Sequence, residues 1–174
     1  AYSATEIGAR NDATSIDNVK SAVKLIRTAN TLRAADGLDP LKINSALMAS
    51  AQVNANVRQA NPTQEIDDYL GLGWKENASS GQSDPLDGWY TQQKKLWDAG
   101  DKNSEKTVNY RNLSDPTLTL TGLGLNTAGD KAPSADQLLI HSTTLQYGYG
   151  VDAYQALLDQ YLAQAVPQLA DLQA

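Results

Sequence analysis

Residues 118–148 read LTLTGLGLNTAGDKAPSADQLLIHSTTLQYG, and this stretch decides the fold class. Its two ends, residues 118–126 and 137–148, are rich in Leu, Ile and Thr, as strands are. The residues between them supply Gly, Pro, Asn and Asp, which are the residue types that form turns. The stretch predicts two antiparallel strands that follow a series of helices. That order favours an α+β fold over an alternating βαβ fold.

Helical patterns occupy most of the chain outside this hairpin. Ser15 and Asn44 are suited to cap the first two helices, and Pro85 is suited to the first position of the third. In the terminal helix Pro167 should cause a bend or a break. The expected elements are helices over residues 15–37, 44–61 and 85–100, an irregular segment over 62–85, a short helix or turn over 104–113, and a terminal helix over 151–173.

Composition excludes several classes of function. The chain has 174 residues and a net charge of −6, which indicates one acidic domain and argues against a nucleic-acid partner. No apolar run is long enough to span a membrane. The chain has no cysteine, which excludes disulfides, a thiol nucleophile and thiolate metal sites. Its one histidine, His141, argues against a Ser-His-Asp triad and against a zinc site of several histidines, and is expected on a strand face.

Asn54 is the polar residue that the helical pattern does not explain. It shares the inward face of the second helix with Leu47, Ala51 and Val57. An inward amide needs hydrogen-bond partners, because an unpaired buried polar group costs about 1–3 kcal/mol. Two interpretations remain open: Asn54 satisfies a structural network, or it forms one wall of a polar binding cleft.

Four stretches occur in a telling order and spacing: TANTLRAADGLDPLKINSALMASAQVNANV (28–57), KENAS (75–79), DGWYTQQKKL (87–96) and NYRNLSDPTLTLTGLG (109–124). Together they resemble the CAP superfamily, also called the SCP or PR-1-like domain, in its bacterial secreted type. The resemblance implies an α-β-α sandwich with a central antiparallel sheet flanked by helices, and an extracellular or cell-surface location. The CAP domain is expected over residues 15–150. Residues 1–14 lack clear periodicity and are expected to form an arm, and residues 151–174, which follow the last strand and a GYG breaker, are expected to form a helical extension.

The resemblance further implies a cleft that in many members holds two His and two Glu able to bind zinc. These four positions fall on Asn54, Glu76, Gln92 and Asn109, so that Glu76 alone is kept. Three amides and one carboxylate are poor zinc ligands, and we expect no metal and no other cofactor. The four side chains could instead form one network in which the amides bond the Glu76 carboxylate. With two aromatic residues that could line a groove, the candidate cleft comprises Asn54, Glu76, Gln92, Asn109, Trp89 and Tyr110.

The expected function is therefore binding without catalysis. The ligand or partner would be a small molecule, a lipid, a glycan or a surface protein. Two alternatives stay open: a structural or adhesion module with a vestigial cleft, and a hydrolase that uses Glu76.

Overall fold

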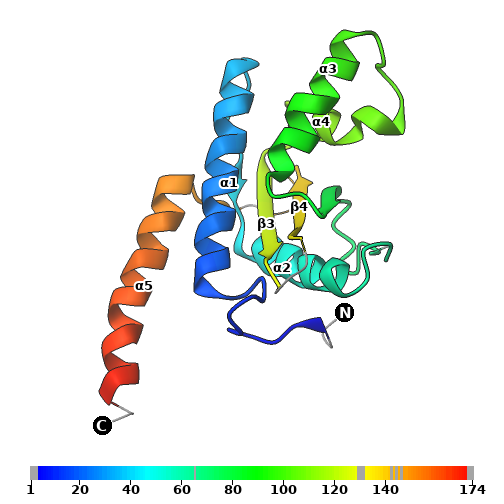
Figure 1. Cartoon of the computed structure of the whole chain (residues 1–174). Helices are drawn as coiled ribbons and strands as arrows, with labels where there is room; N and C mark the ends of the chain where they lie inside the picture. Colours follow the sequence, from blue (N-terminus) through cyan, green and yellow to red (C-terminus); the bar gives the residue numbers. More distant parts are fainter. Residues whose placement is uncertain are drawn as a thin grey trace.

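A computed structural model describes residues 4–64, 66–128, 132–141, 143, 145 and 147–171, with the backbone alone described for 166–171. Figure 1 shows the order of the helices and strands. They are α1 (Ile16–Ala35), β1 (Lys42–Ile43), α2 (Ser45–Ala60), β2 (Lys75–Ser80), the π-helix η2 (Asp87–Gln92), α3 (Gln93–Asp98), the 3-10 helix η3 (Glu105–Thr107), α4 (Val108–Leu113), β3 (Leu120–Asn126), β4 (Ser134–Ile140) and α5 (Val151–Asp171).

The predicted hairpin forms the centre of a four-stranded sheet whose order is β1-β3-β4-β2. β3 and β4 are antiparallel, as predicted, with Leu123 opposite Gln137. β4 begins and ends earlier than predicted, because Ser134 and Ala135 pair with β2 as well as with β3. The strand ends at Ile140, so the expectation that His141 lies on a strand face is wrong. His141 is exposed, with its Nε2 3.4 Å from the hydroxyl of Thr117. Residues 142, 144 and 146 of the expected second strand lie outside the described residues.

Two strands were not predicted. Residues 75–80, KENASS, were expected to be irregular but pair with β4 along their whole length. The segment lacks the usual alternation of apolar and polar residues. Its polar side chains can still face both helical layers, because Arg58 on α2 donates to Glu76 and Asn112 on α4 donates to Asn77. The two-residue strand β1 pairs in parallel with β3, so the sheet is antiparallel except at this edge.

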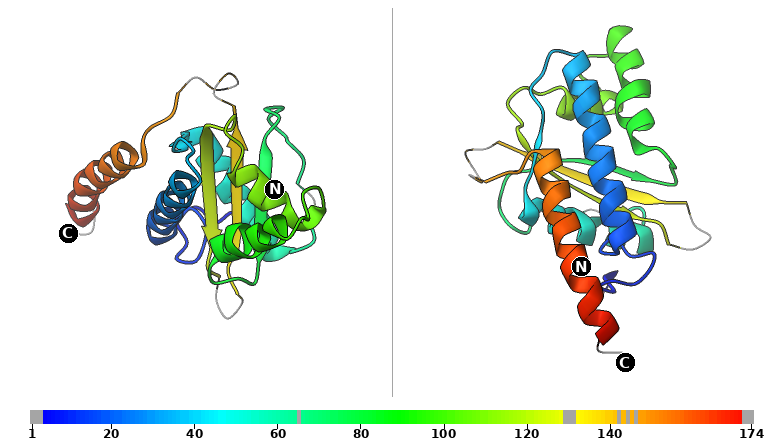
Figure 2. Two further views of the ribbon diagram at one scale, coloured as in Figure 1. Left: turned by 90° about the horizontal axis from the view of Figure 1, so that it is seen from above. Right: turned by 90° about the vertical axis from the view of Figure 1, so that its left-hand side faces the viewer.

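Helices cover both faces of the sheet, as expected of an α-β-α sandwich (Figures 1 and 2). On one face α2 packs Leu47 and Ala51 against Leu120, Leu138 and Ile140. On the other face the larger core gathers residues of α1, η2 and α4 against the sheet, including Ile26, Trp89, Tyr110, Leu123 and Leu139. Successive residues of each strand point to opposite faces, so the two cores are separated by the thickness of the sheet.

The predicted caps are confirmed. The hydroxyl of Ser15 accepts a hydrogen bond from the backbone N–H of Asn18 at 3.3 Å. The side-chain oxygen of Asn44 accepts from the N–H groups of Ala46 and Leu47 at 2.9 and 3.1 Å. The third helix begins at Pro85 as predicted, but it contains a π-helical segment over Asp87–Gln92 that no sequence pattern indicated.

The terminal helix α5 lies beside α1 at the edge of the molecule (Figure 2). The guanidinium of Arg27 on α1 pairs with the Asp152 carboxylate at 2.5 Å. A break at Pro167 is not found, because α5 is one helix from Val151 to Asp171. A proline removes one hydrogen bond from a helix, and at position 167 that loss does not end the helix. Among the described residues no helix has both the length and the apolar character needed to cross a bilayer.

Candidate functional site

Asn54 does point inward, and its amide is bonded on both sides. The residue is fully buried on the face of α2 that packs against the sheet. Its Nδ2 lies 3.3 Å from Oε1 of Glu76 and 3.5 Å from Oδ1 of Asp136, while its Oδ1 accepts from the Tyr69 hydroxyl at 3.4 Å. The buried amide therefore joins α2, β2, β4 and the loop that carries Tyr69.

An ion cluster of Arg58, Glu76 and Asp136 surrounds this amide. Arg58 follows Asn54 by four residues, which places both side chains on one face of α2. Its Nη2 lies 2.7 Å from Oε2 of Glu76, and its Nε lies 2.8 Å from Oδ2 of Asp136. The side chains of Arg58 and Glu76 are 12% and 23% exposed, whereas the Asp136 side chain is fully buried. One cation thus serves two carboxylates in a mostly dry setting.

The imbalance of charge shows in the protonation of Asp136. Burial raises the pKa of the Asp136 carboxyl well above its usual range, and the neighbouring Glu76 carboxylate raises it further. The hydrogen bond from Arg58 opposes both effects, but burial dominates. Asp136 therefore retains a proton to a higher pH than an exposed carboxyl does, which reduces the repulsion between the two acids.

Sequence reasoning did not identify Arg58 or Asp136 as part of this site. A signal existed for Arg58, since it lies one helical turn from Asn54 on the same face. Sequence patterns place Asp136 in a turn, and only its pairing opposite Gly124 and Ala78 directs its side chain toward α2.

Gln92 and Asn109 lie on the other face of the sheet from Asn54 and Glu76. β2 alternates, so Glu76 faces α2 and the next residue, Asn77, faces α4, where its Nδ2 is 3.4 Å from the carbonyl of Asn109. The Gln92 amide bonds the carboxylate of Asp87 at 2.7 Å instead of that of Glu76. Among the described residues, the predicted network of four side chains is therefore divided by the sheet into two pairs.

Gln92, Asn109 and Trp89 line a groove of about 300 Å³. The π-helix η2 and β2 form two of its walls, and π-helical segments occur frequently at functional sites. Trp89 is 1% exposed and its indole N–H donates to the carbonyl of Ala78 at 3.1 Å, so its ring is buried and held against β2 at the groove. The polar lining consists of Ser79, Ser80, Gln82, Gln92, Gln93 and Asn109, with Lys106 as the charged lining residue.

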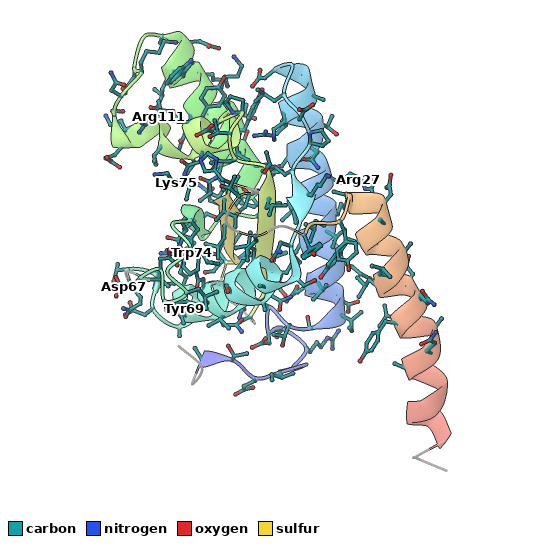
Figure 3. The ribbon with its side chains drawn as sticks, turned by 180° about the vertical axis from the view of Figure 1, so that it is seen from behind. Arg27, Asp67, Tyr69, Trp74, Lys75 and Arg111 are labelled. Carbon is teal, nitrogen blue, oxygen red and sulfur yellow. The ribbon has the colours of Figure 1, made fainter. Side chains whose placement is uncertain are left out.

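Tyr110 is placed differently from the expectation. It is 6% exposed and contacts the rings of Tyr90 and Trp97, with centroids 5.4 and 5.7 Å away. These contacts make Tyr110 a part of the core between η2, α3 and α4. Glu76, for its part, borders a separate pocket of about 370 Å³ with Arg58 and the loop after α2 (Figure 3, where Asp67 and Tyr69 of this loop are labelled).

The zinc that the family resemblance implies does not fit these residues. Its four positions are split between the two faces of the sheet, and the retained carboxylate of Glu76 is already held by Arg58 and Asn54. Within the described part of the chain, no three His, Asp or Glu side chains gather as a metal site would require. A bound divalent cation would also have to displace the guanidinium beside it.

We therefore expect purified protein to contain no stoichiometric zinc. After incubation with Zn²⁺ and gel filtration, elemental analysis should find well below one equivalent, and Zn²⁺ should leave the melting temperature unchanged. One equivalent of zinc that disappears in Glu76→Gln would contradict this reading of the site.

Comparison with known proteins finds one matching family model. The family model of CAP, the cysteine-rich secretory protein family, matches residues 26–147. A search of curated proteins finds no match.

Two solved structures with TM-scores of at least 0.50 share the fold at low sequence identity, and a third is reported beside them. A crystal structure of MpPR-1i soaked with selenourea is 18% identical, with 78% of this chain and 98% of that chain covered and a TM-score of 0.51. An outer surface protein from Borrelia burgdorferi is 14% identical over 71% of this chain and 95% of its own, with a TM-score of 0.50. An extracellular protein containing an SCP domain from Bacillus anthracis is 21% identical over 72% of this chain and 43% of its own, with a TM-score of 0.48.

Proposed function

The chain belongs to the CAP family, and on that premise we propose that it is a non-catalytic binding protein of the cell surface or extracellular medium whose ligand enters the groove beside η2. The description of the family as secretory and the outer-surface location named for the Borrelia protein support the location. The absence of cysteine is no obstacle, because two packed cores hold this fold together without disulfides.

The observation that carries the proposal is the chemistry of the groove. Its polar lining is made almost entirely of neutral amides and hydroxyls, which donate and accept hydrogen bonds without favouring an ion. The hydroxyl of Ser79 lacks a hydrogen-bond partner among the described residues, although it is buried at the groove wall. A neutral ligand rich in hydroxyl groups matches this lining better than a lipid does. Of the expected ligand classes, the groove therefore favours a glycan.

The contacts of Glu76 argue against the hydrolase alternative. A general acid or base must be free to exchange a proton with its substrate. The two oxygens of the Glu76 carboxylate are bonded to Arg58 and Asn54, and the same bonds fasten α2 to β2. We therefore assign Glu76 a structural role.

Binding should depend on the two amides that were predicted from the sequence and reach the groove. The side chain of Gln92 is exposed, and the hydrogen bonds of Asn109 to other described residues involve its backbone, so alanine at either position should leave the fold intact. Each lost hydrogen bond is worth about 0.5–1.5 kcal/mol, so the double variant Gln92→Ala/Asn109→Ala should bind about tenfold more weakly. Titration calorimetry with maltotetraose and chitotetraose as neutral probes measures the effect.

Gln160→Ala, which removes an exposed amide on α5, is the matched control and should bind as the unaltered protein does. Failure of both oligosaccharides to bind the unaltered protein at millimolar concentration would refute the proposed ligand class. Equal affinity of the double variant would show that the sugar binds elsewhere.

A further inference from the structure

A third pocket, of about 240 Å³, is formed by residues of α3, α4 and the turn that follows α4. It is lined by Trp97, Tyr110, Arg111, Ser114 and Asp115. Figure 3 shows Arg111 in the part of the molecule formed by α3 and α4, away from Tyr69 and Trp74. The pocket shares no lining residue with the groove beside η2.

Arg111 has little to bind within the described part of the protein. Its one hydrogen bond there runs from Nη2 to the carbonyl of Ser104 at 3.4 Å, and its Nε is buried without a partner. Among the described residues no carboxylate lies within ion-pair distance of it, although the chain as a whole is acidic. An arginine that has five N–H donors and lacks an anion is suited to receive one from a ligand.

A second unpaired group lies on the same pocket wall. The hydroxyl of Ser114, three residues after Arg111, is also buried without a hydrogen-bond partner among the described residues. Buried polar groups are almost always paired, so two unpaired groups on one small pocket are unusual. Both atoms are shielded from water in this arrangement, and a ligand would engage them after a rotation of each side chain about its own bonds.

The remaining walls indicate what the ligand carries besides its charge. The aromatic rings of Trp97 and Tyr110 contact each other and form an apolar wall. Lys102 lies over the Trp97 ring at 4.4 Å from its centroid, which adds a second positive charge near the pocket. Asp115 contributes a negative charge, and its Oδ1 accepts from the backbone N–H and the hydroxyl of Thr117 at 2.8 and 2.5 Å. That carboxylate opposes ligands of high negative charge.

We propose that this pocket binds a small organic monocarboxylate, with the carboxylate held by Arg111 and Ser114 and the apolar body against Trp97 and Tyr110. A carboxylate matches the planar fork of a guanidinium. A single negative charge tolerates Asp115, whereas the double charge of a phosphate is repelled by it. The site is independent of the proposed function, because its residues do not take part in the groove.

The test uses the full chain with benzoate as the probe. Titration calorimetry and the NMR signal of the Trp97 indole, both at constant ionic strength, measure binding. Benzoate should bind saturably and shift the Trp97 signal. Benzamide, which has the same shape without the charge, and inorganic phosphate should each bind at least about tenfold more weakly. Equal binding of benzamide would overturn the proposal, as would the absence of saturable binding of benzoate.

Variants then assign the binding to these residues. Arg111→Gln should weaken benzoate binding at least about tenfold, whereas Lys95→Gln, which removes a charge from an exposed site on α3, should leave it unchanged. Arg111→Lys keeps the positive charge but loses the planar fork of the guanidinium, and should bind benzoate with intermediate affinity. It serves as the test if Arg111→Gln does not fold. Asp115→Asn should reduce the difference between the affinities for inorganic phosphate and for benzoate. Unchanged benzoate affinity in a folded Arg111 variant would overturn the assignment. Gln92→Ala/Asn109→Ala should bind benzoate normally, so the two proposed sites can fail separately.

Discussion

Replacing Gly122 or Gly124 of β3 with alanine should lower the free energy of unfolding by at least about 3 kcal/mol. A Cβ added at Gly122 would overlap the backbone of Leu47 and Met48 on α2. One added at Gly124 would overlap the backbone of Ala51 and lie 2.6 Å from Cα of Gln52. Backbone atoms cannot rotate away as a side chain can, so α2 would have to move off the sheet.

Chemical denaturation by urea and thermal melting measure this effect. For a chain of this size, about 3 kcal/mol corresponds to a melting temperature lower by about 6–12 °C. Gly88→Ala is the matched control. There the three atoms nearest the new Cβ all belong to the flexible amide end of the Gln82 side chain, and alanine favours a helix over glycine by about 1 kcal/mol. A Gly122 variant as stable as the Gly88 variant would mean that α2 does not approach β3 as closely as described.

Replacing Arg58 with methionine, which removes the charge and keeps much of the volume, should destabilise the fold by about 3–5 kcal/mol at about pH 7.5. Asp136 would then be buried beside Glu76 without a cation to offset either carboxylate. Arg27→Met is the matched control: its pair with Asp152 is largely exposed, with side chains 49% and 88% accessible, and such pairs contribute about 0–1 kcal/mol.

The loss caused by Arg58→Met should shrink as the pH falls. Burial and the neighbouring Glu76 already raise the pKa of the Asp136 carboxyl well above its usual range, and removal of Arg58 takes away the interaction that opposes this shift. Between the unfolded and the folded pKa the folded protein binds more protons, so its stability falls as pH rises through that window. Urea midpoints of the variant and the unaltered protein should therefore lie closer together at about pH 5 than at about pH 7.5.

The second variant Arg58→Met/Asp136→Asn tests the cause. The amide that replaces the Asp136 carboxylate would carry no charge and could still donate a hydrogen bond to Glu76, so stability near neutral pH should recover in part. A difference between the Arg58 variant and the unaltered protein that stays constant or grows at low pH would contradict the ionic explanation and point to lost packing.

Much of the fold could be read from local patterns. Ser15, Asn44 and Pro85 mark the starts of helices because their side chains, or the proline ring, act on backbone atoms only a few residues away. The hairpin of β3 and β4 could also be predicted from local sequence, because its strands are rich in apolar residues and close together along the chain. β2 was missed because its sequence, KENASS, resembles a loop until its partners from distant parts of the chain are present.

The candidate site divides along the same line. The sequence by itself predicted that Asn54 points inward, and Asn54 is fully buried. Its resemblance to the CAP family also predicts that Glu76 keeps an acidic position and that amides stand in place of the zinc histidines, and this assignment stays a prediction. The tertiary structure alone decided which of these residues meet. Arg58 and Asp136 are separated by 78 residues along the chain, yet their ion pair fixes α2 to the sheet. The alternation of β2 sends Glu76 to that cluster and turns Asn77 toward Asn109 on the other face. Residue identity is local, whereas the side of a strand that a residue faces, and the partner it finds there, depend on pairing across the whole chain.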